Sequence, residues 1–142
     1  MSATKNKETV RAIYRAMAAG DRAVFAASVH PDYTWRFPGQ HSWARRFEGQ
    51  TDIDRNLLRP LFNLFETEYT AEAVNLIAEG DLVVAEVCGR VATKRGERYD
   101  NEYCFIFRFQ NGKIIEITEY CDSDLIERVL GSYDDALDAV NA

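Results

Sequence analysis

The chain has 142 residues, of which 46% are hydrophobic and 28% charged, so it can bury a hydrophobic core and is too apolar to be disordered. Its net charge is −6, and it lacks the basic stripe that a nucleic-acid-binding surface requires. No apolar run approaches the roughly 18 residues that span a bilayer, and the N-terminal MSATKNKETV lacks the apolar core of a signal peptide. We therefore expect one domain over residues 1–142, located in the cytoplasm, that binds neither nucleic acid nor membrane.

The cysteines and histidines do not form a metal-binding pattern. Cys88, Cys104 and Cys121 are far apart, odd in number and without CxxC spacing, which argues against a disulfide framework and against a zinc site. The two histidines, His30 and His41, are scattered as well. We expect neither a metal nor a cofactor.

The first part of the chain carries helical patterns and one strand. Apolar residues recur at helical spacing over residues 6–19, and Asp21 can cap a short second helix over 22–28. The segment DYTWRF at 32–37 alternates and then meets Pro38-Gly39, which predicts a strand that ends in a turn.

A loop over 40–49 and a third helix are predicted next. Thr51 and Asp54 form a helix-start signal, and the apolar spacing continues to about Glu66. Pro60 falls inside this helix and is expected to kink or interrupt it.

From Tyr69 onward, short alternating segments predict strands. The predicted strands are 69–78, 82–94, 98–109 and 113–121. A turn that contains glycine separates each neighbouring pair, so these strands form an antiparallel meander. A helix over 124–130 is predicted to follow, with one or two further turns in YDDALDAV. Helices followed by a meander indicate an α+β fold with the helices on one face of the sheet.

The turn at Asn111-Gly112 leaves two strand registers open. A two-residue loop places Gln110 opposite Lys113, whereas a three-residue loop uses Gly112 as a left-handed bulge residue. The second register gathers phenylalanines and isoleucines on one face, and we therefore favour it. It pairs Phe107 with Ile115, Phe105 with Ile117, and Tyr103 with Glu119.

Glu119 is the candidate that matters most for chemistry. The turn at 94–96, treated in the same way, places Val87 opposite Tyr103, so that three strands share one apolar face with Glu119 at its polar end. Burial among apolar side chains raises the pKa of a carboxyl group and suits it to act as a general acid or base. Tyr103 and Asn101 could bind a substrate oxygen or orient the acid; alternatively, they satisfy a buried glutamate that has no substrate.

The opposite face of the predicted sheet mixes charged, apolar and thiol side chains, which suits either solvent or a subunit interface. It carries Val84, Glu86, Cys88, Arg90, Glu102, Cys104, Ile106, Arg108, Glu116, Thr118 and Tyr120.

The strand that ends in WRFPG, together with the motifs YxNxY and GKIxxxxEYxD, resembles the SnoaL-like, ketosteroid isomerase-related branch of the nuclear transport factor 2-like superfamily. The likeness covers nearly the whole chain. It implies a cone-shaped α+β barrel, in which a strongly curved antiparallel sheet surrounds an internal pocket that the N-terminal helices close. It also implies a homodimer formed through the outer sheet face. Members include isomerases, cyclases, epoxide hydrolases, dehydratases and binding domains, so the reaction stays open.

The site residues of two well-known members are only partly present. Matched to ketosteroid isomerase, Tyr14 falls at the oxyanion-hole tyrosine, but Phe37 and Phe105 fall at the two catalytic aspartates. The three positions of the limonene-epoxide hydrolase Asp-Arg-Asp site are here Val87, Gly89 and Glu119. Neither mechanism is therefore expected. Phenazine-biosynthesis A/B-type proteins are more similar locally, at Asn101, Tyr103 and Glu119, and bacterial ketosteroid isomerase-related proteins look closer still.

The leading hypothesis is a cofactor-independent acid/base enzyme that isomerises, cyclises, hydrates or dehydrates a compact, mostly apolar substrate. Its predicted catalytic residues are Glu119, Tyr103, Asn101 and Tyr14. Its predicted substrate-binding residues are Trp35, Phe37, His41, Trp43, Val87, Phe105 and Ile117. For Tyr14 the alternative is core packing, and for His41 it is an exposed loop position. The rival functions are a ligand-binding or dimerisation domain without chemistry, and an epoxide-opening cyclase or hydrolase whose second base would be His41.

Overall fold

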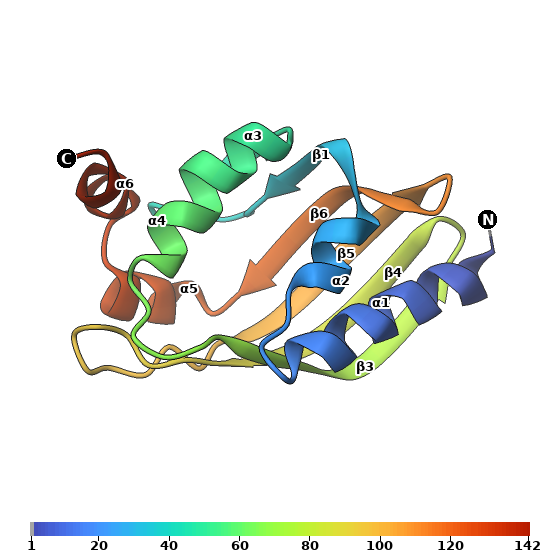
Figure 1. The fold of residues 1–142 in the computed structure, drawn as a ribbon, viewed down its shortest axis with the longest axis horizontal. Coiled ribbons are helices and arrows are strands. Elements are labelled where there is room, and N and C mark those ends of the chain that lie inside the picture. Colours follow the sequence, from blue (N-terminus) through green and yellow to red (C-terminus); the bar gives the residue numbers. More distant parts are fainter. Residues whose placement is uncertain (1) are drawn as a thin grey trace.

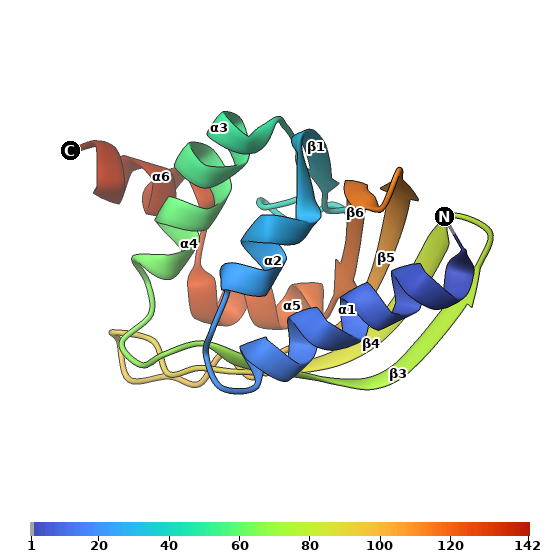
Figure 2. The ribbon, with the colours of Figure 1, turned by 45° about the vertical axis from the view of Figure 1, so that its right-hand side comes forward.

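A six-stranded curved sheet in the order β2-β1-β6-β5-β4-β3 forms the centre of the molecule in the computed structural model, which describes residues 2–142 (Figure 1). The strands are β1 (Val29–Arg36), β2 (Arg46–Glu48), β3 (Thr70–Glu79), β4 (Leu82–Arg90), β5 (Glu102–Gln110) and β6 (Lys113–Cys121). The sheet curves without closing into a barrel (Figure 2). The predicted α+β class is confirmed.

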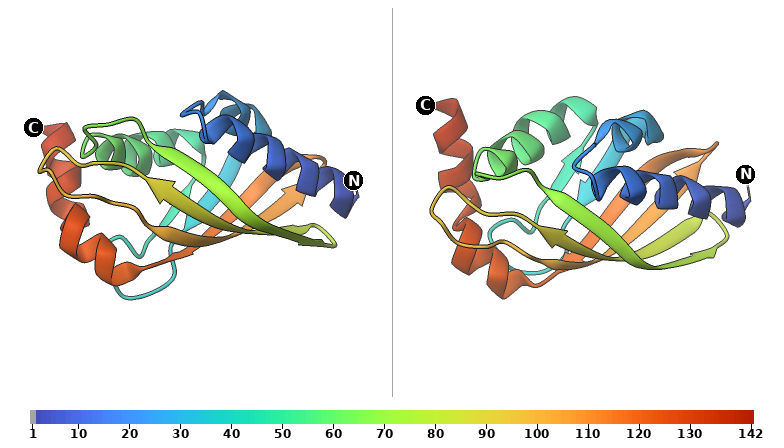
Figure 3. Two further views of the ribbon diagram at one scale, coloured as in Figure 1. Left: turned by 90° about the horizontal axis from the view of Figure 1, so that it is seen from below. Right: turned by 60° about the horizontal axis from the view of Figure 1, so that its bottom comes forward.

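The helices lie over the concave face of this sheet and at one end of it (Figure 1). They are α1 (Ala3–Met17), α2 (Ala23–Ser28), α3 (Gln50–Ile53), the π-helix η1 (Asp54–Leu58), α4 (Arg59–Phe62), α5 (Ser123–Leu125), the π-helix η2 (Ile126–Leu130) and α6 (Tyr133–Asn141). Helices α1 to α4 lie on the same side of the sheet, and no helix of residues 2–142 covers its outer face (Figure 3). No helix within residues 2–142 combines the length and hydropathy needed to cross a bilayer.

The sheet contains one parallel pair, which the sequence did not predict. β1 runs parallel to β6, with Trp35 beside Ile117, and antiparallel to the short β2, with Trp35 opposite Phe47. The segment of β2 was predicted as loop because three residues are too few for an alternation to be recognised. The pairing of β1 joins residues far apart in sequence, which no local pattern indicates.

The hairpin between β5 and β6 corrects the predicted register. Asn111 and Gly112 both have positive φ, 51° and 78°, and Gln110 pairs with Lys113, so the loop has two residues. A bulge follows, because Phe109 pairs with Ile114 and Arg108 with Glu116, which leaves Ile115 as the extra residue of β6.

The bulge changes the cross-strand partners but not the face. Phe105 lies opposite Glu119, and Tyr103 lies opposite Cys121, two positions from the predicted pairing. An offset of two residues keeps the same side chains on the same face. The prediction that Glu119 points inward is therefore confirmed, although the predicted Tyr103–Glu119 pair is wrong.

The β4–β5 register is as predicted, with Val87 opposite Tyr103. The strands themselves are shorter than expected, because the chain between Arg90 and Glu102 keeps only the isolated bridge Ala92–Arg98 of this hairpin. This looser segment still carries Tyr99 and Asn101 to the edge of the inner face.

Pro60 disturbs the third helix in a specific way. In a regular α-helix, the N–H of residue 60 would donate to the carbonyl oxygen of Asn56, and proline has no such group. The hydroxyl of Tyr133 donates to that oxygen instead, at 2.5 Å. The wider π-turn η1 ends at Leu58, two residues before Pro60. The bond from Tyr133 attaches α6 to this segment, which also carries Asp54.

The loop between β1 and β2 is attached to the C-terminal helices as well. The indole nitrogen of Trp43 donates to the carbonyl oxygen of Gly131 at 3.0 Å, and the backbone N–H of Tyr133 donates to the Ser42 hydroxyl at 3.0 Å. Trp43 is buried. These bonds hold the β1–β2 loop against the C-terminal helices at one end of the molecule.

Candidate active site

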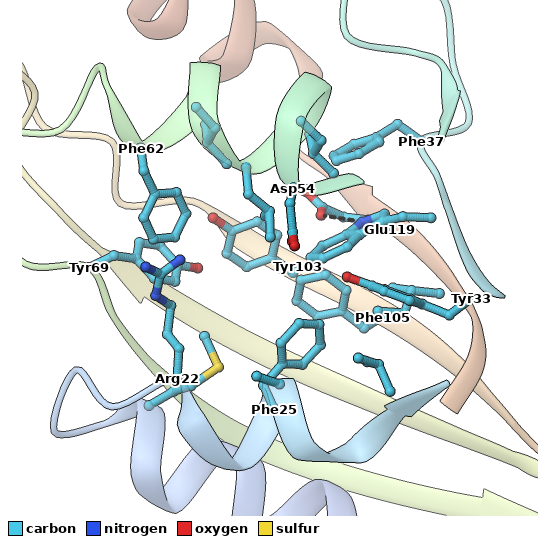
Figure 4. Close-up of a pocket in the computed structure, with 18 of the residues that line it drawn as sticks. Arg22, Phe25, Tyr33, Phe37, Asp54, Phe62, Tyr69, Tyr103, Phe105 and Glu119 are labelled. Atoms are coloured by element: carbon cyan, nitrogen blue, oxygen red, sulfur yellow. Dashed lines mark hydrogen bonds between the residues drawn. The ribbon is translucent and has the colours of Figure 1, made fainter. Parts of the chain in front are cut away.

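A cavity of about 420 Å³ lies between the concave face of the sheet and the helices. Its sheet wall is almost entirely aromatic or aliphatic. The residues of this wall include Val29, Tyr33, Trp35, Phe37, Tyr103, Phe105, Phe107 and Ile117. Figure 4 shows several of these side chains directed into the same space as Glu119. A cavity with this lining favours a compact, mostly apolar ligand.

The exposed residues of the lining mark where the cavity opens. Arg22, Ala23 and Ala26 contribute from α2 and its first flanking residue, whereas Gln50 and Asp54 contribute from α3 and η1. The remaining lining residues are buried or half-buried. The mouth of the cavity therefore lies between α2 and the α3–η1 segment.

Glu119 is the acid inside this cavity, and its side chain is held by two neighbours. The indole N–H of Trp35 donates to Oε1 at 3.2 Å (Figure 4), and the Cys121 thiol donates to Oε2 at 3.5 Å. Only 6% of Glu119 is exposed to solvent. The inward-facing acid is thus fixed by β1 and β6 rather than by β5.

Burial sets the protonation state of Glu119. Removal from water raises its pKa to about 8, although the hydrogen bonds from Cys121 and Trp35 partly oppose the change. Glu119 is therefore mostly neutral at pH 7. Because Trp35 donates to Oε1, the proton of the neutral acid belongs on Oε2, where a thiol is a weak competitor.

Four tyrosines surround the space next to this acid. Burial raises the pKa of Tyr14, Tyr69, Tyr99 and Tyr103 above the usual range, and the nearby Glu119 adds to the increase in each case. A hydrogen bond with Tyr103 partly offsets the increase at Tyr69. All four hydroxyls therefore stay protonated and can donate to a ligand oxygen.

Gly89 makes room for two of these tyrosines. A Cβ atom at this position would lie 2.6 Å from the Tyr69 hydroxyl and 2.9 Å from the Tyr103 ring. The glycine lies on β4 beneath both rings, so its lack of a side chain decides how closely they approach the sheet.

Asn101 is placed differently from the prediction. It is buried but outside the cavity lining. Its amide nitrogen donates to the Tyr99 hydroxyl at 2.9 Å and to the Asp122 carbonyl oxygen at 3.3 Å, while its oxygen accepts from the backbone N–H groups of Glu102 and Asp122. These bonds fix the end of β6 and orient Tyr99.

Most of the other predicted catalytic and substrate-binding residues line the cavity, but two do not. Those in the lining are Tyr14, Trp35, Phe37, Trp43, Tyr103, Phe105 and Ile117. Val87 and His41 lie outside it: Val87 is buried in the sheet, and His41 is half-buried in the β1–β2 loop, with a buried Nδ1 that has no hydrogen-bond partner in residues 2–142.

Many lining residues were not predicted, and four of these, Arg22, Asp54, Tyr69 and Tyr99, carry polar groups that bear on the chemistry. Tyr99 follows the same alternation as Asn101 and Tyr103, and Tyr69 follows that of β3, so a period of two could have indicated both. Arg22 and Asp54 lie in helical segments as ordinary surface charges, and no sequence signal distinguishes them.

In the described part of the chain, residues 2–142, no three His, Cys, Asp or Glu side chains come close enough together to hold a metal ion. Cys88, Cys104 and Cys121 are free and half-buried.

The fold and part of the sequence are similar to those of known proteins. The SnoaL-like domain model matches residues 10–117. The structure of Bal32a from a soil-derived mobile gene cassette is 25% identical, with 90% of this chain and 96% of that chain covered and a TM-score of 0.73. No curated protein sequence is significantly similar to this chain.

Two further solved structures share the fold at lower identity. A candidate SnoaL-like polyketide cyclase from Jannaschia sp. CCS1 is 21% identical, with coverages of 91% and 93% and a TM-score of 0.73. A candidate isomerase from Bacillus subtilis is 19% identical, with coverages of 93% and 98% and a TM-score of 0.74.

Proposed function

Because this chain belongs to the SnoaL-like domain family, we propose that it is a cofactor-independent acid/base enzyme that acts on a compact, mostly apolar small molecule. The reaction is of the isomerase, cyclase or hydratase/dehydratase type. One observation carries the proposal: a buried carboxyl group with a pKa of about 8 faces an apolar cavity that has room for a ligand. The fold neighbours named as a candidate cyclase and a candidate isomerase agree with this class.

Glu119 moves the proton in the proposed mechanism. In its neutral form, Oε2–H protonates a substrate oxygen or carbon, and the resulting carboxylate later takes a proton back from the substrate. A pKa near 8 keeps both forms accessible close to neutral pH. Trp35 stabilises the carboxylate form by donating to Oε1.

The tyrosines stabilise the oxygen on which negative charge develops. Tyr103 and Tyr14 line the cavity and share the environment of Glu119, so each can donate to an enolate or alkoxide oxygen in a site with little water. Asn101 acts as a positioning residue through its hydrogen bond to Tyr99. Trp35, Phe37, Phe105 and Ile117 form the wall that shapes the substrate.

A second candidate function is supported by Asp54. This carboxylate lines the mouth of the cavity (Figure 4), on the segment opposite α2. An epoxide-opening hydrolase or cyclase needs a base in addition to the acid Glu119, and Asp54 fills that requirement better than His41, which lies outside the lining. A ligand-binding domain without chemistry is the third candidate, and it requires that Glu119 only fix a bound molecule.

The experiment that tests the main proposal compares two glutamine variants. Cyclic enones, β-dicarbonyl compounds and aromatic polyketide esters are incubated in deuterated buffer, and turnover or hydrogen exchange at carbon is followed by proton NMR. We expect Glu119→Gln to lower the rate at least about a hundredfold, because it removes the proton that the reaction transfers.

Glu116→Gln is the matched control, since Glu116 lies on the same strand but is paired with Arg108 on the other face. It should keep the wild-type rate. Equal rates for the wild type and Glu119→Gln would reject Glu119 as the acid/base residue, and a loss of turnover in both Glu119→Gln and Asp54→Asn would favour the second candidate.

We also infer a homodimer formed through the outer face of the sheet. Val74, Ile77 and Tyr120 are the most exposed large hydrophobic side chains of the described residues, with 62%, 61% and 46% exposed. Ile77 and Tyr120 belong to the face that has no helix. A dimer would remove this apolar surface from water. The cytoplasmic location stays a prediction.

Analytical ultracentrifugation checks the dimer. At micromolar concentration, the wild-type protein should sediment as a dimer, and Ile77→Glu should sediment as a monomer with unchanged circular dichroism. A monomeric wild-type protein, or a dimeric Ile77→Glu variant, would contradict this interface.

A further inference from the structure

Arg22 is a charged residue of the cavity mouth that the proposed chemistry does not use. It follows Asp21 in the link between α1 and α2, and it lines the cavity although it is otherwise exposed. Its guanidinium carbon lies 4.0 Å from the centre of the Phe62 ring. Figure 4 shows the side chain extending from α2 toward the side of the cavity where Phe62 and Tyr69 lie.

The guanidinium group of Arg22 forms no ion pair in the described part of the chain, and the Glu68 carboxyl group lies against Gly20, two residues before Arg22. Arg45 provides the comparison, because it also lies over an aromatic ring, 4.1 Å from Tyr133, but pairs with Asp134 at 3.2 Å. A stacked guanidinium keeps its N–H groups free at the edge of its plane, where a planar anion can accept them.

The other charges of the cavity favour one orientation for an anion. Glu119 is mostly neutral at pH 7 and does not compensate Arg22. Asp54 is on the opposite side of the mouth, on η1, and repels an anion from that side. An acidic ligand would therefore place its anionic group at Arg22 and its apolar body against the aromatic wall, with Glu119 at the far end.

We propose that the cavity binds compact cyclic or aromatic acids, whose carboxylate or similar anionic group is held by Arg22 where its guanidinium group stacks on Phe62. This substrate class rests on the proposed function, because it assumes that the cavity is the substrate site. The anion fixes the orientation, and the uncharged part of the molecule is the part presented to Glu119.

Two fluorescent probes test this proposal without any turnover. 1-Anilinonaphthalene-8-sulfonate is an anionic aromatic molecule, and N-phenyl-1-naphthylamine is the same molecule without the sulfonate. The chain has only two tryptophans, Trp35 and Trp43, and both line the cavity. Energy transfer from tryptophan to each probe therefore reports binding to the protein, and its dependence on Arg22, a residue of the cavity lining, places the bound probe in the cavity.

We expect Arg22→Gln to weaken binding of the anionic probe about fivefold, the upper range for an exposed ion pair. Binding of the neutral probe should change less than twofold. Arg45→Gln is the matched control and should leave both affinities unchanged, because Arg45 is outside the cavity lining. Asp54→Asn should tighten binding of the anionic probe, and added salt should reduce the difference between the two probes.

Equal weakening of both probes by Arg22→Gln would overturn the proposal, because Arg22 would then act by packing alone. An unchanged affinity for the anionic probe, or a wild-type protein that prefers the neutral one, would also overturn it. Glu119→Gln should bind both probes as the wild type does. If Glu119→Gln is inactive but still prefers the anionic probe, the role of Arg22 in binding is shown independently of the proposed role of Glu119 in catalysis.

Discussion

The variant Glu119→Gln is expected to be more stable than the wild-type protein at pH 8.5 and nearly equal to it at pH 4.5. The pKa of this carboxyl group is about 8 in the folded protein, against an ordinary value of 4.5. Between these two values the unfolded chain releases the proton, whereas the folded protein keeps it. The unfolded state is then favoured as pH rises, and the wild-type protein loses stability.

The size of this effect follows from the same two values. Each pH unit between them lowers the free energy of unfolding by about 1.4 kcal/mol, so the full loss above pH 8 is roughly 4–5 kcal/mol. The contribution of Glu119 is thus fully present below pH 4.5 and is lost as pH rises through 8. Glutamine has nearly the same shape, can accept from Trp35 and does not ionise, so the variant escapes the loss.

Urea unfolding of both proteins from pH 4.5 to pH 9 measures the difference. The exposed Glu102, on the outer face of β5, provides the control, because Glu102→Gln should show no comparable divergence from the wild type. A constant difference between Glu119→Gln and the wild type across this range would mean that Glu119 ionises normally in the folded protein, and the proposed acid would lose its main support.

Gly89 is not a proposed catalytic residue, but Gly89→Ala is expected to displace the tyrosines of the cavity and to destabilise the protein. The new methyl group would meet the Tyr69 hydroxyl at 2.6 Å and the Tyr103 ring at 2.9 Å, closer than packed atoms tolerate. We expect a loss of about 1–3 kcal/mol in the free energy of unfolding, as for other overpacked positions. Tyr69 should also move away from the sheet, because Tyr103 is confined by its stacking on Phe105 at 5.0 Å.

A double-mutant cycle with Tyr69→Phe tests this explanation. Removal of the hydroxyl relieves the shortest of the contacts, so the double variant should be less destabilised than the sum of the single variants. Additive losses would show that the hydroxyl does not cause the strain. Tyr69 and Tyr103 also leave no room at position 89 for the arginine that limonene-epoxide hydrolase was expected to have there.

Local patterns in the sequence were enough to predict which way Glu119 faces. Side chains alternate with a period of two along β5 and β6, so an error of two residues in the strand register leaves every side chain on the same face. The predicted inward orientation was therefore correct although the loop length was wrong and the bulge at Ile115 was not recognised. The bulge itself could not be predicted, because an isoleucine next to an isoleucine fits either face of a strand. Val87 and Asn101 do lie on the inner face of the sheet, as predicted. Alternation does not show whether a residue of that face reaches the cavity or is covered by neighbouring side chains.

The mouth of the cavity was not predictable by the same reasoning. Arg22 and Asp54 come from segments far apart in the chain, and only the packing of α2 and η1 over the sheet brings both to one opening. Trp35 was predicted to line the cavity, but its hydrogen bond to Glu119 was not predicted, because it depends on the parallel pairing of β1 with β6. Such contacts depend on tertiary geometry and leave no periodic signal.

The hydrogen bond from Tyr133 to the Asn56 carbonyl oxygen links two parts of the protein that are 77 residues apart. Asn56 is two positions from Asp54, in the same π-turn. The last helix therefore helps to hold the segment that carries the carboxylate at the entrance. Any event that displaces that helix would change the charge that an incoming molecule meets before it reaches the interior acid.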